Sequence, residues 1–129
     1  MNIISAKGVS MCCSVAAILM LGGCGALDPT VAMVKGGTLQ SCPNSTVEKM
    51  VNGFMGSPSW ESGVGENSVK FVNVGGDITL ADKPVRAVVQ FVVDEKAGSF
   101  EYQAFEINGV PQNTFMAAAL MAKMCESAT

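Results

Sequence analysis

The stretch VRAVVQFVV, residues 85–93, alternates apolar side chains with a period of two more regularly than any other part of the chain. One parity is apolar throughout: Val85, Ala87, Val89, Phe91 and Val93. The other parity also holds valines, Val88 and Val92, which predicts partial cover on that side. A period of two places successive side chains on opposite faces of a β-strand. The stretch therefore predicts the central strand of a sheet.

Strand-like alternation continues on both sides of this segment. Before it, residues 72–80 keep one apolar parity around Gly75-Gly76, which predicts a strand that bends or bulges at the glycines. After it comes a short polar stretch of hairpin length, and residues 100–107 then alternate until the parity shifts near Ala104. We expect a β-bulge at that shift and an antiparallel sheet, because short turns join antiparallel neighbours.

A helical pattern precedes the strands. Residues 46–55 carry apolar side chains at i, i+3, i+4 and i+7, which places them on one face of a helix. Ser45 is the expected N-cap, and Glu48 completes a capping box with it. Gly56 is expected to end the helix in a left-handed conformation.

A second helical pattern follows the strands. Residues 114–126, capped by Asn113 or Thr114, are apolar nearly all round. Such a helix is either deeply packed or keeps one face for another contact.

These elements predict an α+β domain over residues 38–129: a helix, three or four antiparallel strands, and a helix, with the helices on one face of a curled sheet. This order loosely resembles cystatin and NTF2-type folds. The segments GSPSWESG (56–63) and EINGVPQN (106–113) resemble stretches of small bacterial proteins of unassigned function, a resemblance that implies no activity.

The N-terminal residues have the order of an export signal. Lys7 is followed by an apolar run over residues 9–21, which is too short to span a membrane. The run ends in Leu21-Gly22-Gly23-Cys24, which resembles the lipobox of a bacterial lipoprotein precursor. A secretory signal that happens to contain Cys24 is the alternative.

The lipobox resemblance implies a lipid on the Cys24 sulfur and signal-peptidase recognition of Leu21, Gly22 and Gly23. Residues 1–23 would be the signal peptide, and residues 24–37 a lipidated tether. Two or three acyl chains make a stable membrane anchor. Gly25 follows the cysteine with no Asp beside it, which by resemblance favours the outer membrane of the bacterial envelope, facing the periplasm.

Charge and residue types restrict the function classes. The eight cations of the whole chain, less Lys7, leave seven against eleven acids, and no basic stripe is present, so nucleic-acid binding is not expected. The chain has no His, and we expect neither an enzyme nor a metal or cofactor. A carboxylate hydrolase is the enzymatic alternative, with these acids as candidates: Glu61, Glu66, Asp77, Glu101 and Glu106.

The remaining cysteines predict one disulfide. With Cys12 and Cys13 in the signal and Cys24 lipidated, Cys42 and Cys125 are left, 83 positions apart. An oxidising compartment favours their pairing. A metal site or a catalytic thiol lacks partner residues.

Two hypotheses follow for the domain. The first is a non-enzymatic domain that binds an envelope protein through a strand edge or the apolar second helix. The alternative is a carrier of a small apolar ligand, in a pocket lined by Phe91, Phe100, Tyr102 and Phe115. Trp60 is either a binding aromatic or a cap of the core.

Overall fold

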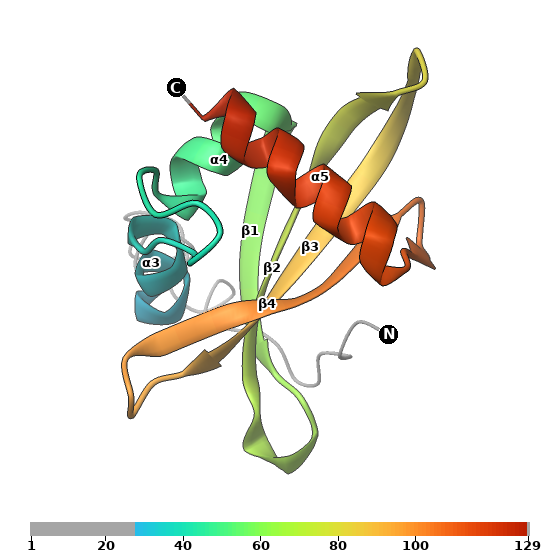
Figure 1. Cartoon of the computed structure of the whole chain (residues 1–129). Coiled ribbons are helices and arrows are strands. Elements are labelled where there is room, and N and C mark those ends of the chain that lie inside the picture. The colour runs from blue at the N-terminus through green and yellow to red at the C-terminus, as the bar shows by residue number, and fades with distance from the viewer. Residues whose placement is uncertain (1–27, 129) are drawn as a thin grey trace, which may run out of the picture.

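The computed structural model describes residues 28–128, which form an α+β fold as predicted (Figure 1). The helices are α3 (Pro29–Gly36), α4 (Val47–Phe54) and α5 (Thr114–Ser127), with a 3-10 turn at Glu66–Ser68. The strands are β1 (Gly56–Val64), β2 (Lys70–Leu80), β3 (Lys83–Asp94), β4 (Ser99–Ile107) and β5 (Val110–Pro111).

The five strands form one antiparallel sheet in the order β1-β2-β3-β4-β5. The predicted central strand is confirmed, because β3 is third in that order. The sheet has five strands where three or four were predicted. β1 (GSPSWESGV) lacks apolar alternation, and β5 is two residues long, so neither has the pattern of a half-buried strand.

Bulges lie close to the predicted positions. Gln90 pairs with Ala104 and Phe91 with Tyr102, so Gln103 is the extra residue of a bulge in β4, which confirms the parity shift. At the glycine pair, β2 itself is continuous, and the irregularity lies in β1 between Gly56 and Ser59. The bulge is therefore in β1, opposite the glycines, and not in β2.

The three helices pack on one face of the sheet (Figure 1). The side chains of β3 that were predicted to face the core do so, and Ala87, Val89 and Phe91 are fully buried. The helices contribute these buried residues: Val31 and Val34 of α3, Val47, Met50 and Val51 of α4, and Ala117, Leu120 and Met124 of α5. On the other parity of β3, Val88 and Val92 are half-buried, as expected.

Helix α3 corrects the expected tether over residues 24–37. The Asp28 side chain caps α3 by accepting from the backbone N–H groups of Thr30 (2.9 Å) and Val31 (3.3 Å). Pro29 occupies the first turn, where its missing N–H is not needed. Val31 and Val34 are buried in the core. The folded domain therefore includes residues 28–37, because two buried apolar positions in an eight-residue helix are too few to show a period in the sequence.

The N-cap of helix α4 lies one residue later than expected. Thr46, not Ser45, accepts a hydrogen bond from the backbone N–H of Lys49 at 3.2 Å. The Ser45 hydroxyl instead donates to the carbonyl of Ala128. After Phe54 the backbone becomes extended and Gly56 enters β1, so the expected left-handed stop is also wrong.

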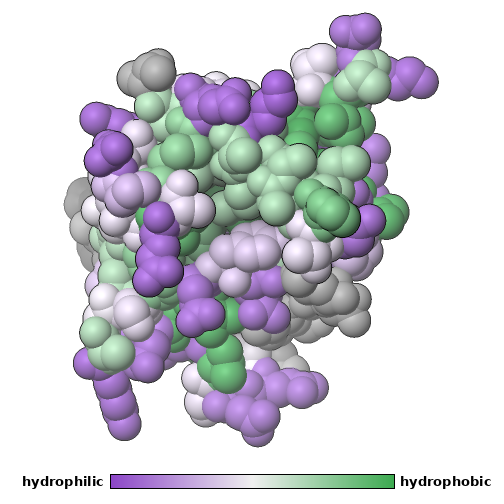
Figure 2. Space-filling model, viewed as in Figure 1, coloured by the Kyte–Doolittle hydropathy of each residue, from purple (hydrophilic) through white to green (hydrophobic). Residues whose placement is uncertain are grey.

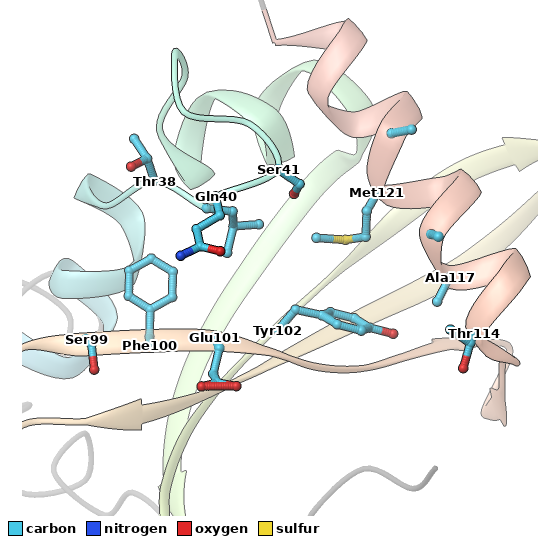
Figure 3. Close-up of a pocket in the computed structure, with 13 residues that line it drawn as sticks. Thr38, Gln40, Ser41, Ser99, Phe100, Glu101, Tyr102, Thr114, Ala117 and Met121 are labelled. Atoms are coloured by element: carbon cyan, nitrogen blue, oxygen red, sulfur yellow. The ribbon is translucent and has the colours of Figure 1, made fainter.

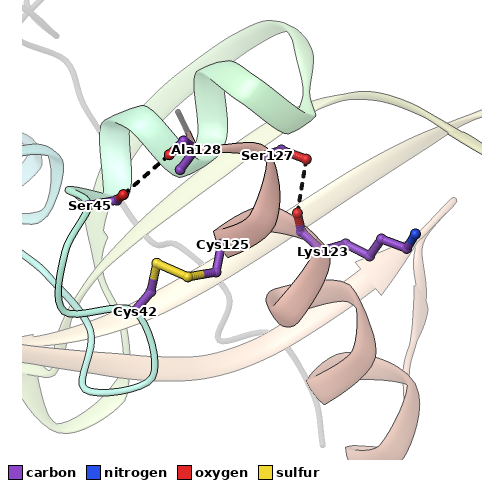
Figure 4. The surroundings of a disulfide bond; sticks show 6 residues. All are labelled: Cys42, Ser45, Lys123, Cys125, Ser127 and Ala128. Atoms are coloured by element: carbon purple, nitrogen blue, oxygen red, sulfur yellow. Dashed lines mark hydrogen bonds between the residues drawn. A yellow bond between two sulfur atoms is a disulfide. The ribbon is translucent and has the colours of Figure 1, made fainter.

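The predicted disulfide joins Cys42 to Cys125, with their Cα atoms 5.8 Å apart (Figure 4). It holds the last turn of α5 against the loop that precedes α4. Leu21, Gly22, Gly23 and Cys24 lie outside the described residues. Within residues 28–128, no helix has the length and apolar character needed to cross a membrane.

Candidate binding groove

A groove of about 790 Å³ opens between β4, the loop at residues 38–41 and α5 (Figure 3). Its apolar lining comes from all three parts of the chain: Leu39, Phe100, Tyr102, Ala117, Ala118, Met121 and Ala122. Polar residues of the loop, Thr38, Gln40 and Ser41, lie around it. Ser99, Glu101 and Thr114 also line the groove, so it combines apolar with polar side chains.

The alternation of β4 directs two aromatic rings into the groove. Phe100 and Tyr102 point toward the loop and α5, whereas Ser99 and Glu101 point the opposite way (Figure 3). The Phe100 ring packs edge-to-face on Phe91, with centroids 5.9 Å apart and an interplanar angle of 88°. These contacts place Phe100 at the boundary between the core and the groove.

Gly37 allows Phe100 to take this position. A Cβ atom at residue 37 would lie 2.4 Å from Cε1 of Phe100. Two carbon atoms that are not bonded do not approach so closely. The Phe100 ring therefore occupies the space that a side chain at residue 37 would need. Gly37 therefore supports the position of a ring that lines the groove.

β4 has an open edge beside the groove. β3 pairs with its inner side, whereas β5 pairs on the outer side only with Glu106 and Ile107. One further backbone bond joins the Gln112 N–H to the Phe105 carbonyl at 2.9 Å. Within the described part of the chain, no strand pairs with the outer side of residues 99–104. Such an edge presents backbone N–H and C=O groups that can pair with another chain.

The first turn of α5 leaves apolar side chains in solvent. Phe115 is 88% exposed and Met116 41%, and Val110 of the neighbouring β5 is 59% exposed. Residues coloured green, as hydrophobic, gather along α5 in Figure 2. Of the two alternatives that the sequence left open for this helix, the structure has the second, with one face packed on the core and another open.

Tyr102 is partly shielded from water where it lines the groove. Its side chain is half-buried, and burial raises the pKa of the Tyr102 phenol. It is the single tyrosine of the chain.

The structure brings together two of the residues predicted for a binding surface. Phe100 and Tyr102 line the groove, but Phe91 is fully buried beneath Phe100, and Phe115 lies outside the lining. Trp60 is half-buried on β1, where Lys35 Nζ lies 5.3 Å from its ring centroid. The expected pocket of four aromatics is thus wrong in two of its members.

Two groove components were missed in the sequence: the loop at residues 38–41 and Met121. The loop has no apolar period, and Met121 was not singled out within the apolar helix expected at residues 114–126. One available signal was the predicted disulfide, because Cys42 brings the end of this loop to the last turn of α5.

The candidate acids do not assemble a shared site in the groove. Glu101 is the one of the five acids that borders it, and its carboxylate points away from Phe100 and Tyr102 (Figure 3). Asp77 lies on β2, where its Oδ1 is 3.9 Å from Nη1 of Arg86. Among residues 28–128, no group of three or more potential metal-ligating side chains is present.

Comparison of the chain with protein-family models, curated proteins and solved structures finds no match in any of the three. The class that the structure defines is therefore an α+β protein with one disulfide and a groove beside an open strand edge. The likeness to cystatin and NTF2-type folds and to small bacterial proteins remains a prediction.

Proposed function

We propose that this chain is a lipid-anchored protein of the bacterial envelope, without enzymatic activity, whose domain binds an extended segment of another envelope protein. The anchor is supported by the sequence Leu21-Gly22-Gly23-Cys24 behind an apolar run. The binding role is supported by the groove between β4 and α5.

The open edge of β4 beside the apolar groove is the observation that carries the binding role. An extended peptide can add to a sheet edge through main-chain hydrogen bonds, while alternate side chains enter neighbouring pockets. Here residues 99–104 provide the edge, and Phe100, Tyr102 and Met121 provide apolar contacts for those side chains. The polar loop at residues 38–41 supplies a rim that can exclude water from the contact.

Two neighbouring alanines on α5 provide a matched test. Ala118 lines the groove, whereas Ala119 is exposed outside its lining. A photo-reactive phenylalanine at residue 118 should crosslink to an envelope protein in living cells, and the same group at residue 119 should not. Equal products from the two positions would contradict the groove as the contact surface.

The crosslinked segment then gives a peptide for direct binding measurements. We expect A118R to weaken binding of that peptide at least about tenfold, a loss of about 1.4 kcal/mol, because the side chain fills the groove. A119R has the same charge on the same helix and should bind like the parent. Similar losses in the two variants would point to a charge effect rather than to occupation of the groove.

The anchor is tested separately by intact mass of the membrane fraction. The parent should carry the mass of a lipidated chain beginning at Cys24. Cys24→Ser should lose the lipid and leave the envelope pellet. A Cys24→Ser protein that is trimmed at the same bond and pellets as tightly as the parent would contradict the anchor.

A carrier of a small apolar ligand is the second candidate. The groove volume of about 790 Å³ lies within the range of small-molecule sites. Palmitate is a suitable probe, and the ultraviolet titration of Tyr102 can follow its binding. Saturable binding of palmitate that A118R abolishes, without a crosslinked protein at residue 118, would favour the carrier.

A further inference from the structure

The start of α3 is held at one end of the sheet by polar contacts with β1 and with the connection between β3 and β4, which in turn contacts β2. Asp28 caps the helix, and its second carboxylate oxygen accepts a hydrogen bond from the Ser62 hydroxyl of β1. The Thr30 hydroxyl donates to Glu95 Oε2 at 2.8 Å. Lys70 Nζ, at the start of β2, lies 2.6 Å from Glu95 Oε1. The chain therefore enters the fold at a defined place.

That place is the end of the sheet formed by two connections, residues 65–69 between β1 and β2 and residues 95–98 between β3 and β4. We call these two connections the tether rim. In Figure 1 they lie at the bottom and the lower left, and the β2–β3 turn at Ala81-Asp82 lies at the opposite end, at the upper right. Most rim residues are exposed.

Covalent geometry limits how far this end can lie from a lipid on Cys24. Four residue steps separate Cys24 from Asp28, and even a fully extended chain of that length reaches about 14 Å. β2 alone, with 11 residues, spans about 37 Å. The attachment point is therefore close to one end of a domain much longer than its attachment.

We infer that the tether rim is the surface that faces the lipid bilayer, and that the β2–β3 turn points away from it. This inference rests on the proposed lipid anchor. Around the rim lie the acids Glu66, Asp94 and Glu95 and the cations Lys70 and Lys96. Three acids against two cations make no cationic patch, so the short attachment, rather than attraction to anionic lipid, sets the orientation.

Tryptophan fluorescence can measure the orientation, because Trp60 is the single tryptophan of the chain. In a Trp60→Phe background, K96W places a probe on the rim and K83W places one beside the β2–β3 turn. Both lysines are exposed and neither side chain has an interaction in the described structure, so the two variants are matched in charge and site. The full-length protein is purified with its lipid and reconstituted into vesicles of phosphatidylethanolamine and phosphatidylglycerol.

A nitroxide on the lipid headgroup should quench the emission of K96W and leave that of K83W unchanged, at low and at high salt. An insertion of about twenty Gly/Ser residues between Ala26 and Leu27, with a root-mean-square reach of about 25 Å, should remove the difference. Equal quenching of the two probes in protein whose mass carries the lipid overturns this inference and leaves the anchor intact. A mass without lipid removes the anchor, and this inference with it.

Discussion

Gly53 shows how a single residue sets the contact between two helices. It lies in α4, and a Cβ atom built on it would be 2.1 Å from the carbonyl oxygen of Ser127, near the end of α5. The obstacle is backbone rather than a side chain, so it cannot rotate away. The end of α5 is also held by the disulfide at Cys125 and by the hydrogen bond from Ser45 to Ala128 (Figure 4).

We therefore expect Gly53→Ala to destabilise the domain by about 1 to 2 kcal/mol, since the clash exceeds the gain of about 1 kcal/mol in helix propensity. Gly36→Ala is the matched control in α3, because nothing lies within 4 Å of its Cβ position. It should be neutral or stabilising by less than about 1 kcal/mol. Urea unfolding of the oxidised proteins measures both changes, and equal midpoints for the two variants would contradict the packing of α4 on α5.

Tyr102 gives a second prediction at the residue scale. Burial raises the pKa of its phenol, so the native state favours the neutral form. Its contribution to stability should be complete below the ordinary tyrosine pKa and should be lost as the pH rises through the raised native value. Ultraviolet absorbance of the phenolate should show a higher midpoint in the folded protein than in urea, where the groove is lost. Coincident titrations would show that the ring is open to water.

At the scale of elements, α3 depends on contacts that are remote in sequence. Its hydrogen bond from Thr30 to Glu95 joins residues 65 positions apart, and its buried valines pack on the sheet. An isolated helix of eight residues has little stability in water. The sequence of α3 therefore could not indicate a helix by itself, whereas β3 could be identified because its period of two extends over the whole strand.

The Glu95 contact predicts a pH dependence of this docking. Hydrogen bonds from Lys70 and from Thr30 lower the pKa of the Glu95 carboxyl. Its stabilising contribution should be complete above the ordinary carboxyl pKa and should be lost as the pH falls through the lowered native value. Glu95→Gln should remove this part of the acid sensitivity, so its unfolding free energy should change less between neutral and acidic pH than that of the parent.

Glu66→Gln is the control for this measurement. It removes one exposed carboxylate from the same end of the sheet without touching Thr30 or Lys70. Urea midpoints at neutral pH and at about pH 3 compare the three proteins. If Glu66→Gln and Glu95→Gln lose the same amount of pH dependence, the contact with α3 has no particular role.

At the scale of the whole molecule, the disulfide closes almost the entire domain. Cys42 lies before α4 and Cys125 in the last turn of α5, so the sheet is enclosed in a loop of 83 positions. Closing a loop of that length restricts the unfolded chain by about 4 to 5 kcal/mol of entropy. The same bond holds the loop at residues 38–41 beside α5, which couples the stability of the fold to the shape of the groove.

Replacing both cysteines by alanine should therefore reduce the unfolding free energy by about 4 to 5 kcal/mol, close to the whole stability of a small domain. Reductant should lower the parent to a similar value and leave the double variant unchanged. Guanidinium unfolding with and without reductant makes the comparison. Equal midpoints for the oxidised parent and the double variant would show that the bond does not stabilise the fold.

The sequence by itself determined the central strand, the bulge in β4, the helices α4 and α5 and the cysteine pair, because each depends on a local period or on residue type. Only the tertiary structure decided that α3 belongs to the core and that Gly53 meets Ser127. It also decided which aromatics line the groove, since Phe91 of β3 and Phe100 of β4 lie on the same face of the sheet, yet one is covered and the other reaches the surface. Burial at that level depends on which distant element packs above each residue, and a local pattern does not contain that information.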